Sequence, residues 1–516
     1  MQKIVLLAIN SKYVHSTLAV WLLAQSIKEL APVVVETNIN QEIDSIVAEV
    51  TYHNPDIIGI SCYIWNAKIM PEVIKQLKLA LPNAKILMGG PEAVHNADFW
   101  LNQGACEVLY GEGEKSLPAY FELEPQEFVD PFTPQYLQAL KGKIAYIESS
   151  RGCPFNCAYC LSGTDPVRHF PLEIVKEQIR KLITADVRII KFVDRTFNCN
   201  AKRVYELIEF LIGLNSPVKF HFEVAADLFD ERTLQLLATA PPGLIQIEIG
   251  LQSFFAPTLK ASTRTTNLNK AIANIKTLLK PGNIHIHLDL IAGLPHEDLT
   301  QFANSFNQAY EIGAHKLQLG FLKLLHGSQM RKTQTEMIYD PQPPYEIIKS
   351  PWMSEADFKT LHITENALQH THNKEHFLET ITYAMQASNL TPYDFYFRMG
   401  HAFQKDKMAL ELYAGKIFEF CKSLPGVEEQ KLIYVMICDW LQMVKGVNMP
   451  SFLKMGDKKQ IMPYLKIAET NLGLKLRRNE VAILPNGCGV YVDANIKNPV
   501  TGLYKLHFIE NQEEIL

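Results

Sequence analysis

Three cysteines lie within one short stretch of the chain, SRGCPFNCAYCLSG, as Cys153, Cys157 and Cys160. Pro154 and Asn156 keep this stretch non-helical, so that three sulfur atoms can converge on one centre. A structural zinc ion needs four ligands, usually in two separated pairs. A cubane of four irons held by three thiolates instead keeps one iron open for a small chelating molecule. The spacing therefore favours a 4Fe-4S cluster.

Two other uses of these thiols stay open. Zinc could bind if His169 or Cys199 supplied a fourth ligand, although Cys199 is far from the loop in sequence. The thiols could also remain free.

From residue 143 onward, apolar strands alternate with helical stretches, and the cysteines follow the first strand. Strands are predicted at residues 144–150, 189–197, 219–226, 245–254, 284–294 and 316–325. Six β-α steps are close to the number in an α/β barrel, here a partial (β/α)6 barrel, whose chemistry belongs at the C-terminal ends of the strands. The cysteines lie at one such end.

Residues 1–125 also alternate buried strands with helices, which predicts a doubly wound parallel sheet of the α/β class. A ligand of such a sheet sits at the carboxyl ends of the strands. The loops at these ends are rich in glycine and small polar residues, which lets a backbone approach a large ligand closely. They cover residues 10–16, 61–66, 89–92 and 111–114. Alternatively, Gly89, Gly90 and Pro91 simply turn the chain.

The chain thus divides into three predicted domains. The N-terminal sheet takes residues 1–125, a proline-containing linker takes 126–142, and the barrel takes 143–335. Residues 336–516 show helical periods followed by a strand-like tail, which predicts a mostly helical C-terminal domain. A hairpin turn is expected at Asn486, Gly487 and Gly489.

Composition excludes several classes of protein. The chain has 516 residues, and 50 basic against 55 acidic side chains give a formal charge of −5, so it offers no broad cationic face for nucleic acid. No apolar run is long enough to span a membrane, and the N-terminus does not read as a signal peptide. Nine cysteines without a secretion signal indicate reduced thiols and a cytoplasmic protein.

The cysteine spacing, with Tyr159 before the last cysteine, resembles the signature of radical S-adenosylmethionine (SAM) enzymes. Further matches follow in order: FVDRTFN at 192–198, FEV at 222–224, IGLQS at 249–253 and DLIAGLPHE at 289–297. In this family SAM chelates the open iron, and one electron from the reduced cluster splits it into methionine and a 5′-deoxyadenosyl radical. The resemblance implies a flavodoxin- or ferredoxin-type electron donor.

The same resemblance suggests which residues contact SAM. Tyr159 would touch the adenine, Asp194 would lie near the cofactor, and Glu223 would contact the amino acid part. Gln252 and Ser253 would lie near the ribose or the substrate. The alternative for Glu223 and Gln252 is a place in the barrel scaffold. Independently of the family, Glu223 should point opposite to its neighbours in the strand, and a buried carboxylate needs a partner such as an ammonium group.

The N-terminal domain is similar to the cobalamin-binding domain that precedes many radical SAM barrels. Its expected contacts with the corrin and its tail are Asn10, Ser11, Ser61, Gly89, Gly90, Pro91, Gly111 and Glu112. The Asp-x-His-x-x-Gly motif that supplies a cobalt ligand in other cobalamin proteins is absent, so the lower face could be open. His15 on the first loop is a weaker candidate for that ligand. The C-terminal domain resembles the domain of unknown function 4080, with PPYEIIKSPWMSEADF at its head.

These resemblances imply a cobalamin-dependent radical SAM enzyme, with methyl transfer to an unactivated carbon of a small-molecule or peptide substrate as the preferred chemistry. Cyclisation or another rearrangement without methylation is the alternative. RNA methylthiolation is disfavoured, because that family carries three further N-terminal cysteines and this domain has only Cys62 and Cys106. A non-catalytic cobalamin or metal carrier is a fourth reading. His370, His372 and His376 could bind a metal, but a solvated helix end is the preferred interpretation.

Overall fold

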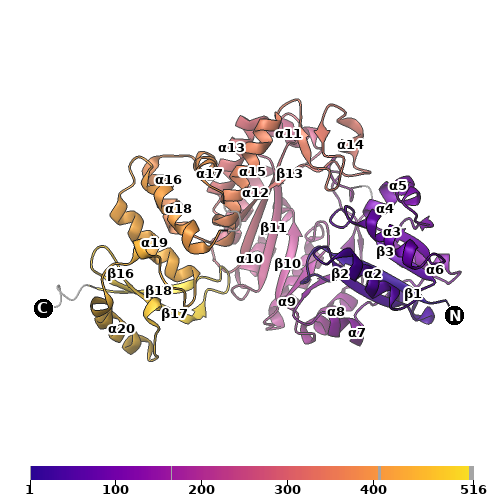
Figure 1. The fold of residues 1–516 in the computed structure, drawn as a ribbon, viewed down its shortest axis with the longest axis horizontal. Coiled ribbons are helices and arrows are strands. Elements are labelled where there is room, and N and C mark those ends of the chain that lie inside the picture. Colours follow the sequence, from indigo (N-terminus) through magenta and orange to yellow (C-terminus); the bar gives the residue numbers. More distant parts are fainter. Residues whose placement is uncertain (1, 164–165, 405–407, 511–516) are drawn as a thin grey trace.

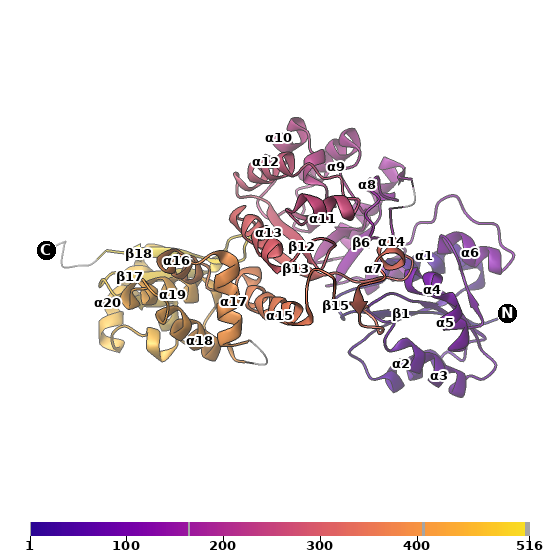
Figure 2. The same ribbon diagram turned by 90° about the horizontal axis from the view of Figure 1, so that it is seen from above.

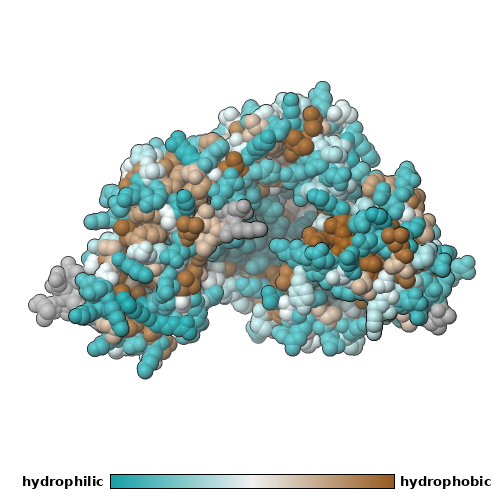
Figure 3. Space-filling view, viewed as in Figure 1, coloured by the Kyte–Doolittle hydropathy of each residue, from teal (hydrophilic) through white to brown (hydrophobic). Residues whose placement is uncertain are grey.

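The computed structural model of the protein describes residues 2–163, 166–404 and 408–510, and it places three units in a row (Figure 1). The N-terminal unit and the C-terminal unit lie on opposite sides of the central barrel, and the two chain ends lie far apart (Figure 2). A hollow lies between the outer units on the face seen in Figure 3, and hydrophilic residues dominate in its depth. The structure confirms the predicted α/β fold class.

The N-terminal unit is a five-stranded parallel sheet in the order β2-β1-β3-β4-β5. Its strands are β1 (Ile4–Asn10), β2 (Val33–Asn38), β3 (Ile57–Ser61), β4 (Lys85–Gly89) and β5 (Glu107–Val108). Its helices are α1 (Leu18–Ser26), η1 (Lys28–Leu30), α2 (Ile43–Thr51), α3 (Met70–Ala80), α4 (Pro91–His95), α5 (Ala97–Asn102) and α6 (Gly113–Tyr120). Every residue of β1 is buried, as expected for a central strand covered on both faces. The strand order changes direction between β1 and β3, so the loops after these two strands run to opposite sides of the sheet. Sheets of this type bind ligands in the crevice between such loops.

The segment between the first two units contains a short helix, α7 (Pro134–Ala139), and packs tightly. Tyr136 is fully buried, and its ring stacks on Trp21 of α1 at 4.6 Å and on Phe132 at 5.7 Å between centroids. The Thr133 hydroxyl caps α7 by accepting a hydrogen bond from the backbone N–H of Tyr136. This segment therefore adds to the core beneath α1.

The central unit is a six-stranded parallel sheet in the order β13-β12-β11-β10-β9-β6. The strands are β6 (Ile144–Ile147), β9 (Ile189–Phe192), β10 (Lys219–Val224), β11 (Ile245–Gln252), β12 (His285–Ala292) and β13 (Lys316–Phe321). Helices α8 (Leu172–Thr184), α9 (Ala201–Gly213), α10 (Glu231–Ala238), α12 (Leu268–Leu279) and α13 (Leu299–Glu311) form an arc outside the strands (Figure 2). Four short elements lie between them: β7 (Ser150–Arg151), β8 (Arg168–His169), η2 (Ala226–Leu228) and α11 (Ala256–Ala261).

The strands alternate between a buried apolar face and a polar face. In β11, Ile245, Ile247 and Ile249 are buried, whereas the residues between them are partly accessible. The apolar face packs against the helices, because successive side chains of a strand point to opposite sides. The polar face therefore lines the inside of the barrel.

The first loop of the N-terminal unit extends the open edge of the barrel. His15 forms a parallel bridge with Ile144, and the backbone N–H of Ile144 donates to Val14 at 2.8 Å. The loop thus covers backbone groups of β6 that an edge strand would otherwise expose.

The C-terminal unit is mostly helical, as predicted, and the strand-like tail belongs to the antiparallel sheet β16-β17-β18. The short helix α14 (Gln329–Thr333) follows the last barrel strand. The C-terminal unit then comprises β14 (Ile338–Tyr339), β15 (Ile347–Lys349), α15 (Glu355–His370), η3 (His372–Lys374), α16 (Leu378–Ser388), α17 (Pro392–Ala402), α18 (Leu410–Lys422), α19 (Glu429–Met443), η4 (Ser451–Leu453), α20 (Lys458–Leu472), η5 (Arg478–Glu480), β16 (Val481–Ile483), β17 (Gly489–Lys497) and β18 (Tyr504–Ile509). The backbone N–H of Leu484 donates to Cys488, which closes the expected hairpin turn. None of the helices in the described residues combines the length and apolar character needed to cross a bilayer.

The C-terminal unit contacts the strand starts of the barrel at two turns. At the first, the Asn373 side chain hydrogen-bonds both backbone groups of Leu317, and His285 Nε2 donates to Glu375 Oε1 at 2.9 Å. At the second, Pro499 lies against Gly243. The prediction of a solvated helix end was wrong for His372, because its side chain is only partly accessible and its ring lies 4.9 Å from that of Tyr310. This burial lowers the pKa of His372 to about 4.

We expect Gly243→Ala to destabilise the protein by more than about 1 kcal/mol, the usual cost of a left-handed backbone alone. Gly243 has a φ of +76°, and an added Cβ would lie 2.2 Å from the carbonyl oxygen of Pro499. Gly282→Ala is the matched control, because Gly282 has a φ of +67° but nothing within 4 Å of the added Cβ. Thermal unfolding should show a larger loss for Gly243→Ala. Equal losses would mean that the contact with Pro499 adjusts without cost.

Candidate active site

The cysteine loop begins where β6 ends, and Asp194 fixes its first residues. The Asp194 carboxylate accepts hydrogen bonds from the Ser149 backbone N–H at 2.8 Å and from the Ser149 and Ser150 hydroxyls at 2.6 Å each. Burial raises the pKa of this carboxyl, and the serine hydrogen bonds oppose that rise. The structure therefore places Asp194 at the base of the loop, where it joins the ends of β6 and β9.

The three thiols lie on one loop but contact different groups. Cys153 Sγ is 3.5 Å from the Thr196 hydroxyl, Cys157 Sγ accepts from Arg264 Nη1 at 3.4 Å, and Cys160 Sγ accepts from a backbone N–H at 3.4 Å. Among residues 2–163, 166–404 and 408–510, no three His, Cys, Asp or Glu side chains are grouped so that they could hold a metal ion. The donor set nevertheless fits an iron–sulfur cluster, which three thiolates with nearby N–H donors can hold.

Titratable side chains form a row across the inner face of the barrel. Glu223, Glu248 and His287 are register partners on β10, β11 and β12, so their side chains lie on the same face of the sheet. Phe222 and Val224 are buried on the opposite face, as predicted from the pattern of the strand. The Glu223 side chain is exposed to solvent.

The row is short of positive charge. Partial loss of hydration inside the barrel, together with the negative charge of Glu248, raises the pKa of Glu223 to about 7. Glu248 keeps a lowered pKa because His221 Nε2 bonds its Oε2 at 3.1 Å. Burial and the charge of Glu248 raise the pKa of Asp289 well above its usual value. Such a group of carboxylates fits a cationic ligand, and the amine of SAM is one.

Arg264 joins this row to the cysteine loop, although the sequence did not single it out. Its Nη1 donates to Cys157 Sγ and to the Tyr159 hydroxyl, both at 3.4 Å, and its Nη2 donates to the backbone oxygen of Gly250. Arg264 Nε is buried and has no partner in the described part of the chain, and the same holds for Oδ1 of Asp289. For Asp289 the sequence offered its place in the alternation HIHLDLI of β12 and at the start of the motif DLIAGLPHE, but no role in binding.

Gln252 and Ser253 diverge at the end of β11. Gln252 has a φ of +72°, and its side chain lies over Gly250, where an added Cβ would come within 2.1 Å of Gln252 Nε2. Its Oε1 is buried without a partner in the described residues. Ser253 is completely buried, and its hydroxyl donates to Glu297 at 2.6 Å. The structure thus brings Gln252 to the inner face and turns Ser253 toward Glu297.

The loops of the N-terminal sheet meet at its carboxyl edge. Asn10 is buried and accepts from the Thr17 hydroxyl, whereas Ser61 Oγ is buried with no partner in the described residues. Gly89 and Gly111 have room for another group, because an added Cβ would meet nothing closer than 4.0 Å. Ser61 and Gly89 are register partners on β3 and β4, so an unpartnered hydroxyl lies beside an open glycine, which fits a cofactor that approaches the backbone.

The remaining residues predicted at this edge occupy less open positions. Gly90 has a φ of +95° and packs against the backbone of Cys62, so that an added Cβ would lie 2.6 Å from the Cys62 oxygen. This conformation agrees with the interpretation that Gly90 turns the chain. Pro91 is exposed at the first position of α4, and Ser11 is partly exposed after β1.

Glu112 lies at the joint with the barrel. It pairs with Arg151 at 3.0 Å and with Lys115 at 2.6 Å, and it also contacts Arg168. Arg151 bonds Glu114 and Glu148 as well, only two residues before Cys153. The turn at Gly111 and Glu112 is therefore tied to the cysteine loop, a contact that sequence spacing does not reveal.

His15 faces the barrel in this structure. Its Nδ1 lies 2.6 Å from the Tyr146 hydroxyl, and burial together with Lys191 and Lys12 lowers its pKa. Its ring is therefore engaged by the first barrel strand.

Family models match the chain in three consecutive segments. The B12 binding domain matches residues 4–121, the radical SAM superfamily matches 147–309, and a protein family of unknown function (DUF4080) matches 333–476. The chain belongs to the cobalamin-binding radical SAM family. Its cofactors are accordingly cobalamin, a 4Fe-4S cluster and SAM, as the sequence resemblance implied.

Two curated relatives are methyltransferases by name. The cobalamin-dependent radical SAM methyltransferase TokK of Streptomyces tokunonensis is 24% identical over 51% of this chain and 46% of its own. The 2-(S-pantetheinyl)-carbapenam-3-carboxylate methyltransferase of Streptantibioticus cattleyicolor is 24% identical over the same shares. The chain spans about half the length of these relatives.

Solved structures share the fold at low identity. The radical SAM methyltransferase TsrM of Kitasatospora setae, bound to tryptophan and a SAM analogue, matches with a TM-score of 0.53 at 13% identity, over 68% of this chain and 80% of its own. The cobalamin-dependent radical SAM enzyme OxsB, bound to aqua-cobalamin, matches with a TM-score of 0.55 at 13% identity, over 85% and 78%. These two structures extend the fold similarity beyond the barrel.

Proposed function

We propose that the protein transfers a methyl group from cobalamin to an unactivated carbon of a small-molecule or peptide substrate. The observation that carries this proposal is the contact between the first loop of the cobalamin-binding domain and the inside of the barrel, made by His15 and Tyr146 at 2.6 Å. With this contact, the two predicted cofactor sites would face one shared space. The names of the two curated relatives support methyl transfer.

Each cofactor has a set of proposed partners in the chain. Cys153, Cys157 and Cys160 would hold the cluster. Asn10, Ser11, Ser61, Gly89, Gly90, Pro91, Gly111 and Glu112 would border cobalamin. When bound, the cluster and SAM supply a hydrogen-abstracting 5′-deoxyadenosyl radical, and cobalamin supplies the methyl group.

The inner face of the barrel orients SAM in this proposal. Ionised Glu223 would hold the amine, and Arg264 would hold the carboxylate, since a guanidinium is suited to bidentate binding of carboxylates. Tyr159 would border the adenine. Gln252 would present its unpartnered amide oxygen, whereas Asp194 and Ser253 would support the loop and the strand end that carry these groups. Fixed orientation and exclusion of water protect a reactive radical from side reactions.

Two further features complete the proposal. The domains would extend over residues 1–125, 143–335 and 336–516, with 126–142 joining the first two. The enzyme would work in a reducing cytoplasm with a flavodoxin- or ferredoxin-type protein as electron donor.

Product counting tests the methyl transfer. After anaerobic reconstitution with iron, sulfide and hydroxocobalamin, the reduced enzyme should convert SAM into methionine, 5′-deoxyadenosine and S-adenosylhomocysteine in the presence of substrate. S-adenosylhomocysteine is diagnostic, because it forms only when a second SAM methylates cobalamin. Formation of 5′-deoxyadenosine and methionine without it would exclude methylation and leave radical chemistry of another kind.

Rearrangement or cyclisation is the second candidate. The anaerobic magnesium-protoporphyrin IX monomethyl ester cyclase of Rubrivivax gelatinosus is 23% identical over 50% of this chain and 49% of its own. The same product count separates the two candidates, since a cyclase forms no S-adenosylhomocysteine.

RNA methylthiolation is not proposed, although a tRNA methylthiotransferase of Rickettsia prowazekii is 24% identical over 54% of this chain. The N-terminal cysteines lie at different ends of β4. Cys62 is buried, and its backbone N–H bonds Gly89 at the end of this strand, whereas exposed Cys106 bonds Ile86 near its start. These two thiols do not form the start of a second cluster site.

A further inference from the structure

One stretch of the barrel carries only positive charge. Residues 249–288 contain no Asp or Glu, although the whole chain has 55 acidic against 50 basic side chains. The basic residues of this stretch are Lys260, Arg264, Lys270, Lys276 and Lys280. All four lysines are exposed. The stretch thus forms a local positive surface on a chain of net negative charge.

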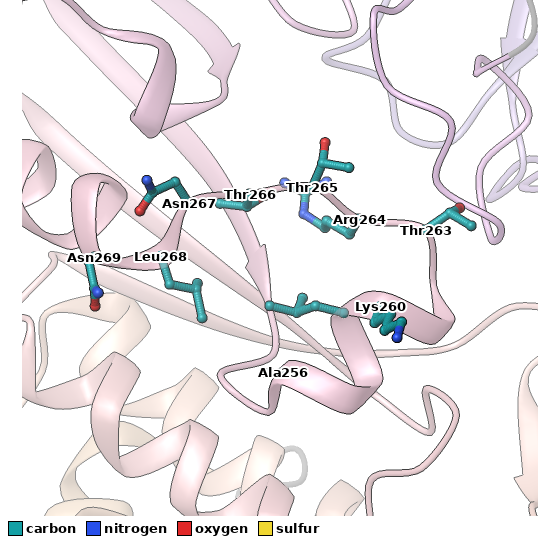
Figure 4. Close-up of a pocket in the computed structure, with 10 residues that line it drawn as sticks. Ala256, Lys260, Thr263, Arg264, Thr265, Thr266, Asn267, Leu268 and Asn269 are labelled. Atoms are coloured by element: carbon teal, nitrogen blue, oxygen red, sulfur yellow. The ribbon is translucent and has the colours of Figure 1, made fainter.

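This stretch also contains a hollow of about 520 Å³ at the protein surface, between α11 and the start of α12 (Figure 4). Lys260, Thr263, Thr265 and Asn267 border it and are exposed. Three hydroxyls of neighbouring threonines and two asparagine amides add hydrogen-bonding groups to the positive charge.

The hollow directly adjoins the cysteine loop. The backbone N–H of Ala158 donates to the oxygen of Ser262 at 3.0 Å, and the Thr263 hydroxyl donates to the oxygen of Asn156. Arg264 borders the hollow and donates to Cys157 Sγ at 3.4 Å. A single side chain therefore separates this surface from a proposed ligand of the cluster.

Among the described residues that border the hollow, none is acidic. Asp227 is buried and accepts from the backbone N–H of Asn267 at 2.9 Å. Asp230 and Asp298 cap the starts of α10 and α13 by accepting backbone hydrogen bonds. Glu231 is the exposed acid of the first turn of α10.

We propose that the surface around Lys260 and Lys270 is the docking site for an acidic one-electron carrier protein, of the flavodoxin or ferredoxin class. This inference rests on the proposed function, because it supplies the electron on which reductive cleavage of SAM depends. One electron passes from the reduced carrier to the oxidised cluster, so the carrier is oxidised and the cluster is reduced. Opposite charges steer such an encounter, and the reduction is faster the closer the carrier approaches the cluster loop.

The test compares protein and chemical reductants on the reconstituted holoenzyme. The double variant Lys260→Glu with Lys270→Glu reverses the surface charge without touching the proposed SAM or cluster ligands. Lys270 lies in the first turn of α12, where a glutamate suits the helix dipole, so this change should not harm folding. Lys416→Glu, exposed on α18 of the C-terminal unit, is the matched control.

With reduced flavodoxin or ferredoxin at low ionic strength, the double variant should form 5′-deoxyadenosine with a kcat/KM lowered by about tenfold or more. The loss should shrink as KCl is raised, because salt screens exposed charges. With dithionite as the reductant, the double variant and the wild type should react at equal rates. Lys416→Glu should match the wild type with every donor.

Three outcomes would overturn the docking site: equal rates of the double variant and the wild type with both carriers, an equal loss with dithionite, or a wild type that only dithionite reduces. Absence of 5′-deoxyadenosine from the wild type with dithionite would instead refute the proposed function itself. The two failures are therefore distinguishable.

Discussion

Alanine at all three of Cys153, Cys157 and Cys160 should give a folded protein that holds no iron–sulfur cluster and does not cleave SAM. The three thiols are the proposed protein ligands, and without them iron and sulfide have no binding site. After anaerobic reconstitution, iron and sulfide should fall from about four of each per chain to background. Formation of 5′-deoxyadenosine should fall to the level without enzyme. The fold should persist, because the loop lies outside the barrel strands and only Cys157 is buried.

Single substitutions outside the loop serve as controls and test the zinc alternative. Cys106→Ala, at an exposed thiol of the N-terminal unit, should retain the cluster. Cys199→Ala and His169→Ala should also retain it if three thiolates hold a cluster with one open iron. Complete metal loss in either variant, with zinc in the wild type, would establish a four-ligand zinc site and contradict the radical mechanism.

Buried strands and the cysteine loop could be predicted because their signals are local. In β11 the alternation IQIEIGLQ indicates one apolar and one polar face, and the structure shows that alternation of burial. The same period-two rule places Glu223 opposite Phe222 and Val224. Six such strands separated by helical stretches admit few topologies, so the partial barrel followed from the pattern.

The contacts that join the site could not be read from the sequence, because they connect residues far apart in the chain. Arg264 and Cys157 are separated by 107 residues, and His15 and Tyr146 by 131. Each contact depends on how loops leave neighbouring strands or on how two domains pack. The short-range alternation of apolar and polar residues carries no information about either. Arg151 belongs to the same class, since its partners Glu112 and Glu114 lie in another domain.

Backbone direction also changes what neighbouring residues do. Spacing alone places Gln252 and Ser253 together at the end of one strand. The positive φ of Gln252 folds its side chain back over Gly250, and Ser253 then faces Glu297 on the buried side. The partial burial of His372 has a similar origin, because the turn after α15 packs on the strand starts of the barrel through Asn373 and Glu375.

Replacing Glu223 with glutamine should weaken the binding of SAM by about 30-fold or more, since bound SAM would cover the carboxylate and removing one partner of a buried charge pair costs about 2–5 kcal/mol. Equilibrium dialysis of SAM against the reconstituted, oxidised enzyme measures this without cleavage. The wild type should also bind SAM more tightly as the pH rises through about 7, because only the ionised carboxylate pairs with the amine and the pKa of Glu223 is about 7. Glu223→Gln should lose this pH dependence.

Stability provides the control, because its expected change has the opposite sign. The pKa of Glu223 is raised from 4.5 to about 7 in the folded chain, so the folded state binds more protons between these values. The free energy of unfolding therefore falls as the pH rises through that window, and Glu223→Gln should remove this fall. Glu209→Gln, exposed on the outer helix α9, should leave both SAM binding and its pH dependence unchanged. If Glu223→Gln bound SAM as the wild type does, Glu223 would be part of the barrel scaffold, and the amine would have to pair with another carboxylate of the row.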